Sequence, residues 1–447
     1  MAIFTNRVLL RCLNENALIV SRERLHDWGQ RLDDIRDDYA ATEWEIVLVN
    51  RLSKLGTVEY ERPERGRIDL VFSTSDVGAS FAADIVTISD QQLHKNNPIG
   101  RFWEELSRRV RHVRSGGFAF HIGEKRQPIH LGSGNKRSLL LPAKPRDRDR
   151  LIFNDAFEMF LQFVKRSPGS SREYHAVSPG VDVRIAYRPG RYGVFQGQHG
   201  SYTDTTVIDN NPLFNALKGK TQKRQLKRCN FDGPKGIIVC DGGCRMLDEP
   251  LSHHSTYSVR QVVGEFFRQH KSVDFVAVIA IKSEWPSTSG RSYRYALNLF
   301  VRPGKEVLEG RLRGVLEKVI RDLPRLEMTP ENAIQRLKFS KATGRDIAPG
   351  GGWQVSDRTI RISARSLLDL MAGKLSQDRF VKEHSLGGGN FFELHLKRGE
   401  LITKASVEQR PDEDDDWIVF EFGPPDVAVA SFQKALSQVD KKRRVDS

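Results

Sequence analysis

The 447-residue chain has little cysteine and no long apolar run, and each scarcity excludes a class of protein. Its four cysteines are irregularly spaced and form no CxxC pair, which argues against a disulfide framework and favours a reducing cytoplasm. Cys240 and Cys244 lie near His253 and His254, but this spacing matches no zinc signature. No stretch of about 20 apolar residues occurs, so we expect no signal sequence and no membrane span.

Nucleotide-binding signatures are absent as well. The chain contains neither a GxGxxG nor a complete GxxxxGK[S/T] pattern, so Asp241 and the two glycines after it are interpreted first as a turn that ends a buried strand. An alternative stays open, because loops at the carboxyl ends of α/β strands often bind ligands. Under that hypothesis the region around Asp241 binds a small molecule and the acidic residues elsewhere are structural.

Positive charge is in excess. The 71 lysine and arginine residues outnumber the 57 aspartate and glutamate residues, which gives a formal net charge of +14 and favours a polyanionic partner such as DNA. Basic residues gather in two predicted helices that could contact phosphates. The predicted nucleic-acid-binding residues are Arg101, Arg108, Arg109, Lys220, Lys223 and Arg224. For the first helix an alternative stays open, in which Arg101 and Arg108 pair with neighbouring glutamates of the same helix.

Between residues 43 and 90, acidic residues occur on one predicted helix and two predicted strands. Apolar residues recur at helical spacing over 44–55, and Glu43 and Glu45 stand at the borders of this apolar stripe. Alternating segments then predict strands at 57–63, 67–75 and 79–89, the last two carrying Asp69 and Asp84. Carboxylate oxygens are ligands that Mg²⁺ prefers, so the pattern predicts a divalent metal site. Three unrelated surface acids are the alternative.

This order of elements resembles the core of the PD-(D/E)xK, or restriction-endonuclease-like, nuclease superfamily over residues 1–125. The resemblance implies that Asp69 in GRIDLVF and Asp84 in FAADIV bind Mg²⁺ or Mn²⁺, and that Glu45 in EWEIVLVN completes the metal shell. It therefore implies catalytic and metal-binding roles for these three residues. The segment FAADIVTISDQQLHKNNP also resembles a group of uncharacterised bacterial proteins, which implies no activity.

One position departs from the family pattern. The lysine that the family places two residues after the second acid corresponds to Val86 in this chain. Activation of the attacking water would then fall to the metal alone or to a cation from another element, for which Lys95 and Lys125 are the nearest candidates. Two hypotheses follow: a metal-dependent DNA endonuclease, which the resemblance associates with bacterial defence against foreign DNA, and a catalytically degenerate subunit that binds nucleic acid, a protein partner or a second copy.

The predicted fold class is α/β. We expect a restriction-endonuclease-like mixed sheet flanked by helices at 1–145, a second α/β region at 146–325 that can be continuous with the first, and a small α+β appendage with a basic tail at 326–447. Residues 125–150 are dominated at both ends by glycine, proline and charge. This composition predicts a loop or linker that either contacts nucleic acid or is solvated.

Overall fold

The computed structural model describes most of the chain and divides it into two compact units, Met1–Arg345 and Asp346–Ser447. The described residues are 3–33, 39–61, 68–74, 78–89, 98–110, 112–113, 116–128, 135–189, 193–196, 208, 211–222, 225–247, 257–284, 292–326, 330, 333, 353–356, 358–377, 380, 391–426 and 428–429. Within these ranges, no helix is long and apolar enough to cross a membrane.

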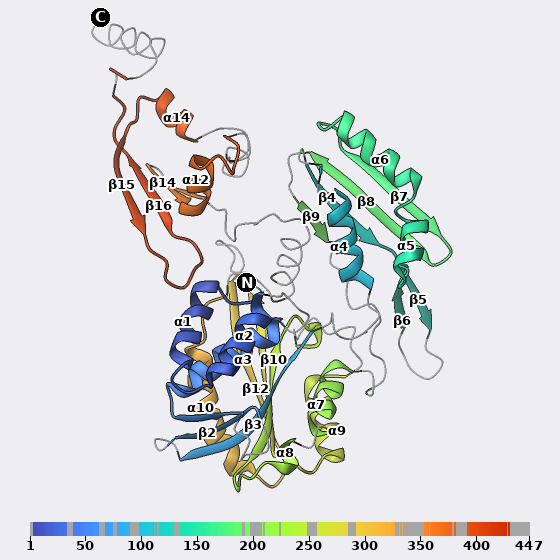
Figure 1. The fold of residues 1–447 in the computed structure, drawn as a ribbon, viewed down its shortest axis with the longest axis vertical. Coiled ribbons are helices and arrows are strands. Elements are labelled where there is room, and N and C mark those ends of the chain that lie inside the picture. The colour runs from blue at the N-terminus through green and yellow to red at the C-terminus, as the bar shows by residue number, and fades with distance from the viewer. Residues whose placement is uncertain are drawn as a thin grey trace, which may run out of the picture. The chain divides into compact units, whose positions relative to one another are not determined.

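A mixed sheet of six strands forms the centre of the first unit (Figure 1). Its order is β1-β2-β3-β10-β11-β12, in which β3, β10 and β11 run parallel and the remaining neighbours pair antiparallel. The strands are β1 (Thr57–Tyr60), β2 (Leu70–Thr74), β3 (Ala79–Ile88), β10 (Lys235–Asp241), β11 (Phe275–Glu284) and β12 (Ser292–Val301). The regions predicted at 1–145 and 146–325 therefore share one sheet.

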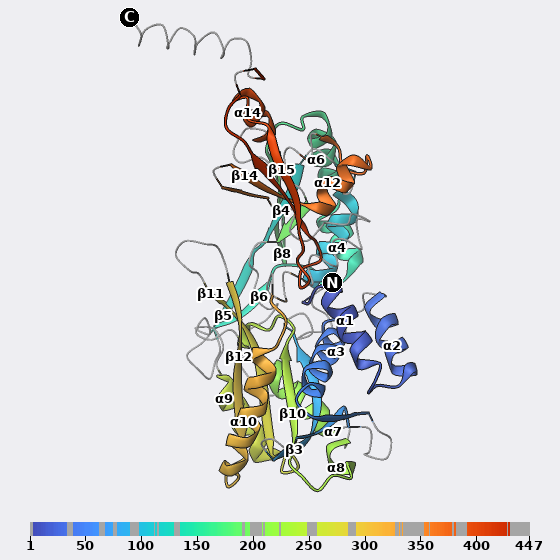
Figure 2. The same cartoon turned by 90° about the vertical axis from the view of Figure 1, so that its left-hand side faces the viewer.

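Helices cover both faces of this sheet because its strands carry apolar side chains on both sides. Alternate residues of β10 illustrate this: Ile238 packs with α1, α3 and α10, whereas Ile237 and Val239 pack with α7 and α9. Figure 2 shows α10 lying along β12. The helices are α1 (Asn6–Asn16), α2 (Arg22–Asp33), α3 (Tyr39–Ser53), α7 (Pro212–Gln222), α8 (Gln225–Arg228), the short 3₁₀ helix η4 (Arg245–Leu247), α9 (Val259–Gln269) and α10 (Glu306–Arg321).

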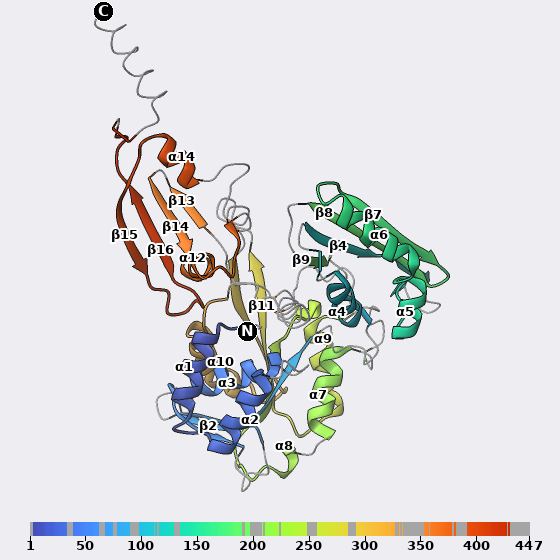
Figure 3. The ribbon, with the colours of Figure 1, turned by 45° about the horizontal axis from the view of Figure 1, so that its top comes forward.

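A second sheet is inserted between β3 and α7, with the order β7-β8-β4-β9 (Figure 3). Helices α4 and α6 pack on its apolar face through aromatic rings, including Phe102 against Phe120 and Phe157 against Tyr174. The elements of this insertion are α4 (Pro98–Val110), β4 (Gly116–Ile122), β5 (Glu124–Pro128), β6 (Asn135–Leu139), α5 (Pro145–Leu151), α6 (Asp155–Arg166), β7 (Arg172–Ser178), β8 (Val181–Pro189) and β9 (Gly193–Gln196).

The prediction of a loop or linker at 125–150 is wrong. Within this segment β5 and β6 pair as an antiparallel ribbon, and α5 follows. The paired segments EKRQP and NKRSL are mostly polar and charged, so the sequence has no hydrophobic alternation that would predict strands there. The glycines between them lie outside the described residues.

The second unit is a small α+β structure. Its antiparallel sheet has the order β13-β14-β16-β15, and a core that includes Ile360, Ile362 and Phe422 packs beneath its helices. Its described elements are β13 (Trp353–Ser356), β14 (Thr359–Ser363), α12 (Ala364–Met371), α14 (Phe391–Lys397), β15 (Ile402–Glu408) and β16 (Trp417–Phe422). The unit begins at Asp346, later than the predicted start at residue 326.

Candidate active site

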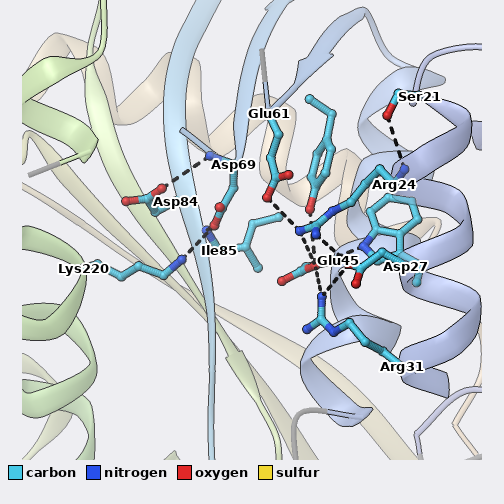
Figure 4. A network of polar contacts seen from close by, with 12 residues as sticks. Ser21, Arg24, Asp27, Arg31, Glu45, Glu61, Asp69, Asp84, Ile85 and Lys220 are labelled. Atoms are coloured by element: carbon cyan, nitrogen blue, oxygen red, sulfur yellow. Dashed lines mark hydrogen bonds and ion pairs between the residues drawn. The ribbon is translucent and has the colours of Figure 1, made fainter. Parts of the chain in front are cut away.

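Two aspartates lie side by side on neighbouring antiparallel strands. Asp69 directly precedes β2, and Asp84 lies in β3 beside the Leu70–Ala83 pair. The Ile85 backbone N–H donates to Asp69 Oδ2 at 2.6 Å, and the Asp69 N–H approaches Asp84 Oδ1 at 3.4 Å (Figure 4). Asp69 is 8% exposed and Asp84 is fully buried. The sheet register therefore holds two carboxylates together in an environment that disfavours uncompensated charge.

Lys220 of α7 supplies a cation to this pair. Its Nζ donates to Asp69 Oδ2 at 2.8 Å, and both side chains are more than four-fifths buried. Burial by itself would lower the pKa of Lys220, but the attraction of the Asp69 and Asp84 carboxylates raises the pKa above its ordinary value. Lys220 is thus an ammonium ion at neutral pH.

The local sequence explains why Lys220 points inward. Asn211 caps α7 by accepting from the backbone N–H groups of Leu213 and Phe214, which fixes where the helix starts. The buried side of α7 is then formed by Leu213, Phe214 and Leu217, and Lys220 follows Leu217 by three residues on the same side. Helix α7 contacts β3, which brings this lysine to the aspartates.

Glu45 of α3 lies within a polar cage next to the aspartates. Its Oε2 accepts from Trp28 Nε1 and from the Tyr60 hydroxyl, both at 3.2 Å. The same oxygen lies 3.5 Å from Arg31 and 3.8 Å from Arg24. Burial, reinforced by the nearby Asp69 charge, raises the pKa of Glu45. Glu45 is therefore held by side chains of α2 and β1.

Arg24 links this cage to a fourth carboxylate. Its guanidinium donates to Glu61 at 2.7 Å and to Asp27 at 2.6 Å. Glu61 is fixed at the end of β1, where its backbone N–H donates to the Asp69 carbonyl at 3.0 Å. Burial raises the pKa of Glu61, partly opposed by Arg24 and reinforced by Asp69. The two acids predicted on strands thus belong to a larger charged network.

The described residues of this network carry excess negative charge. Five carboxylates stand against three cations, a difference of two. The carboxylates are those of Asp27, Glu45, Glu61, Asp69 and Asp84, and the cations are Arg24, Arg31 and Lys220 (Figure 4). Such an excess in a buried site favours either proton uptake or binding of a further cation.

The predicted set of three metal ligands is not assembled in this structure. Among the described residues, no group of three or more histidine, cysteine, aspartate or glutamate side chains is arranged to hold a metal ion. Glu45 is instead surrounded by its own donors, whereas Asp69 and Asp84 remain adjacent. Their hard oxygen donors fit Mg²⁺, which is commonly bound by one or two carboxylates plus substrate phosphates and water. Glu43 has a structural role, since it accepts from the backbone N–H groups of Ile3 and Phe4.

Val86 stands at the position where the family pattern has a lysine. Val86 packs in the apolar layer between the sheet and α7, so it brings no polar group to the site. Of the two substitutes predicted from the sequence, Lys125 is an exposed residue of β5, and Lys95 lies outside the described residues. Sequence reasoning placed Lys220 among phosphate contacts and missed its contact with Asp69, because no local pattern links two residues that lie 151 positions apart.

The predicted basic surfaces separate into different parts of the fold. Arg101 and Arg108 are exposed on α4, which packs on the inserted sheet. Arg109 pairs with Asp149 at 2.5 Å and stacks on the Phe153 ring. The alternative interpretation paired the arginines of α4 with glutamates of the same helix. The structure gives one of these glutamates, Glu105, another partner, since its carboxylate accepts two hydrogen bonds from the buried Arg148 guanidinium. The remaining predicted contacts, Lys223 and Arg224, lie outside the described residues.

Asp241 has the interactions of a turn residue. Its Oδ1 accepts from the backbone N–H groups of Gly243 and Cys244, and its Oδ2 accepts from that of Ile281. Its carbonyl accepts from the Trp44 indole at 2.8 Å. These contacts agree with the interpretation of Asp241 as the end of a strand.

Comparisons with protein-family models, with curated proteins and with solved structures found no match.

Proposed function

We propose that the chain is a metal-dependent nuclease of the PD-(D/E)xK type that acts on DNA. The observation that carries the proposal is the 2.8 Å contact between Lys220 Nζ and Asp69 Oδ2, beside Asp84. Two acids and a lysine are the residue types that this chemistry needs, and here the lysine comes from α7 instead of from β3. Lys220 would thereby take the role of the family lysine, whose own position in β3 is occupied by Val86.

The order of elements supports the same proposal. Helix α3 is followed by the antiparallel strands β1, β2 and β3, and after the insertion by α7 and the parallel strand β10. The sequence resemblance, drawn over residues 1–125, had α4 and β4 as the helix and strand that follow β3. In the structure β4 belongs to the inserted sheet, on which α4 packs, and α7 and β10 take these two places in the central fold. The insertion between β3 and α7 leaves the central sheet continuous, because β10 pairs with β3 along seven residues, Lys235 to Asp241.

Asp69 and Asp84 would hold Mg²⁺ or Mn²⁺ together with phosphate oxygens of the substrate. When bound, the ion lowers the pKa of its water and neutralises charge on the phosphate. Lys220, whose Nζ donates to Asp69 Oδ2, would stabilise negative charge that develops on the scissile phosphate.

Plasmid cleavage tests the proposal. Purified protein would be incubated with supercoiled plasmid and Mg²⁺ or Mn²⁺, beside Asp84→Asn, Lys220→Met and the matched control Lys218→Met. We expect metal-dependent nicking that Asp84→Asn abolishes, that Lys220→Met slows by about 100- to 1,000-fold, and that Lys218→Met leaves unchanged. Equal cleavage by all four proteins would show a contaminating nuclease and remove the support for this site.

A catalytically degenerate subunit is the second candidate function. The observation in its favour is that the three predicted metal ligands do not form a metal-binding group among the described residues. In that case neither the unmodified protein nor the variants cut DNA with either metal, while their DNA affinities stay equal. A role in defence against foreign DNA accompanies the nuclease candidate and rests on the family resemblance.

A further inference from the structure

The sheet of the second unit has an open edge at β15. This strand is the last in the order β13-β14-β16-β15, and among the described strands it pairs only with β16 (Figure 3). Residues 402–407 of β15 are exposed, and Glu408 is half-buried. A strand at the edge of a sheet presents a row of backbone N–H and C=O groups that can pair with another strand. The edge of β15 is therefore accessible to strand addition.

Apolar side chains of β15 share in this exposure. Ala405 pairs with Phe420 of β16, which packs against the core of the unit, so Ala405 lies on the same face of the sheet as that core. Val407 follows two residues later and points to the same face. Its side chain is nevertheless 61% exposed. A strand added beside β15 would cover Val407 along this edge.

Charged residues and bulges usually protect an exposed edge from pairing. In β15 the register shifts between Ile402 and Lys404 and is regular from Lys404 to Glu408. The irregularity thus lies at the start of the strand. Lys404 and Glu408 carry opposite charges and stand four residues apart, so they point to the same face of the sheet.

These two charges are complementary between two copies of β15. In an antiparallel pair with a two-fold axis at Ser406, Lys404 of each copy lies opposite Glu408 of the other. Opposite charges at directly opposed positions stabilise a β-pair. On the other face, Ala405 of each copy lies opposite Val407 of the other. An axis at Lys404 or at Glu408 would instead oppose like charges, so charge favours the axis at Ser406.

Neighbouring strands extend this complementarity. Within one copy, Glu408 contacts Arg361 of β14 at 3.1 Å and Arg410 at 2.5 Å. Lys404 donates to Glu421 of β16 at 3.0 Å. Pairing of two copies would therefore join Arg361 and Glu408 of one copy to Lys404 and Glu421 of the other in a row of alternating charge. Ion pairs in such a network stabilise more than isolated surface pairs do.

We propose that β15 is a self-association edge through which two copies of the chain pair antiparallel, with a two-fold axis at Ser406. Two four-stranded sheets then join into one sheet of eight strands. The assembly stops at two copies along this edge, because each β15 has its partner in the other copy. Self-association is independent of metal binding and of DNA cleavage.

Two opposite charge reversals test the pairing. Sedimentation velocity would follow the full chain over a series of concentrations, beside Lys404→Glu and Glu408→Lys, each alone and both in an equimolar mixture. Each variant alone opposes like charges twice at the junction, so we expect its dimer affinity to fall at least about tenfold. In the mixture, reversed charges meet each other and unchanged charges meet each other. The mixed dimer should therefore form with an affinity within about threefold of that of the unmodified protein.

Recovery in the mixture also shows that both variants fold. The matched control is Lys374→Glu, at an exposed position after α12, which makes the same change of charge and should leave the dimer affinity unchanged. An unmodified protein that stays monomeric throughout the series would overturn the proposal. So would charge-reversed variants that dimerise as tightly as the unmodified protein, or that fail to associate when mixed.

A cysteine on the proposed axis tests the register. Ser406→Cys places two thiols at directly opposed positions, with β-carbons about 5 Å apart, whereas Thr403→Cys separates them by about 20 Å along the strands. All four native cysteines are buried, so the introduced thiol is the accessible one. Mild oxidation should link Ser406→Cys into covalent dimers and leave Thr403→Cys as single chains on a non-reducing gel. Equal cross-linking of the two variants would contradict the axis at Ser406.

Discussion

At the scale of single residues, the site is defined by how its charges are compensated. Asp69 and Asp84 are buried next to each other, and Lys220 is the cation that contacts Asp69 directly. Removing one partner of a buried ion pair costs more than the pair contributes, because the remaining charge stays buried. Replacing Lys220 should therefore change the free energy of unfolding, whether or not activity is measured.

We predict that Lys220→Met lowers the free energy of unfolding by about 3 kcal/mol in metal-free buffer. The exposed fraction of the lysine side chain is 15%, so solvent screens this pair only partly. Urea unfolding at pH 7.5 measures the effect, with Lys218→Met expected within about 0.5 kcal/mol of the unmodified protein. The added Mg²⁺ should restore more stability to Lys220→Met than to the unmodified protein, since Asp69 then has no competing ammonium. Equal stabilities of both variants would contradict the role of Lys220 as the counter-ion.

Glu45 should make stability depend on pH. Because its pKa is raised in the folded protein, the folded state binds this proton more tightly than the unfolded chain does. The stability contributed by Glu45 is fully present below the ordinary glutamate pKa of about 4.3, and it is lost as the pH rises through the raised value. Glu45→Gln removes that loss. The free energy of unfolding of this variant, relative to that of the unmodified protein, should therefore increase with pH.

Urea unfolding at intervals from pH 4 to pH 8 measures this difference. The exposed Glu23 on α2 provides the matched control, and Glu23→Gln should give a curve parallel to that of the unmodified protein. Parallel curves for Glu45→Gln would mean that Arg24 and Arg31 compensate the Glu45 charge completely.

At the scale of elements, periodic patterns predicted what local sequence determines. The helix expected over 44–55 corresponds to α3, and the strand expected at 79–89 corresponds to β3. Asp84 could be placed on its strand for the same reason, whereas Asp69, predicted within a strand at 67–75, directly precedes β2. Neither the cage of Glu45 nor the contact of Lys220 could be predicted, because both join residues from separate elements across the fold. These side chains are positioned by tertiary packing, which no short stretch of the sequence reveals.

The junction of α4 and α5 shows an element contact that depends on geometry as much as on charge. The Arg148 guanidinium is fully buried, donates two hydrogen bonds to Glu105 and two more to the carbonyls of Pro142 and Ala143. A lysine ammonium cannot reproduce this planar arrangement of donors. We predict that Arg148→Lys lowers the free energy of unfolding by about 2 kcal/mol.

Chemical denaturation of Arg148→Lys measures this cost, with Arg150→Lys as the control on the same helix. Arg150 is 72% exposed and pairs only with Asp147 at 3.6 Å among the ion pairs described, so its replacement should change stability by less than about 0.5 kcal/mol. A similar small effect for both variants would show that Glu105 keeps adequate donors without the guanidinium.

At the scale of the whole molecule, the chain builds one central sheet from two distant segments. β3 and β10 are neighbours in the sheet, although the entire second sheet and the β5–β6 ribbon lie between them in the sequence. Parallel strands tolerate long connections, which explains why the insertion does not interrupt the core. The sequence left open whether the regions predicted at 1–145 and 146–325 were continuous, because the pairing of strands across such a distance leaves no local pattern.

The two compact units have separate cores, and this should appear in unfolding. Apolar residues of Asp346–Ser447 pack around Ile360 and Phe422, whereas the first unit has far larger clusters on both faces of its sheet. Small cores bury a smaller share of their surface and are less stable. We predict two calorimetric transitions for the full chain, the lower one belonging to the second unit. A chain ending at Arg345 should lose that transition, keep the upper one within about 3 °C, and retain the stability difference between Lys220→Met and the unmodified protein. A single transition, or an upper transition displaced further by the truncation, would show instead that the second unit supports the core that holds Asp69, Asp84 and Lys220.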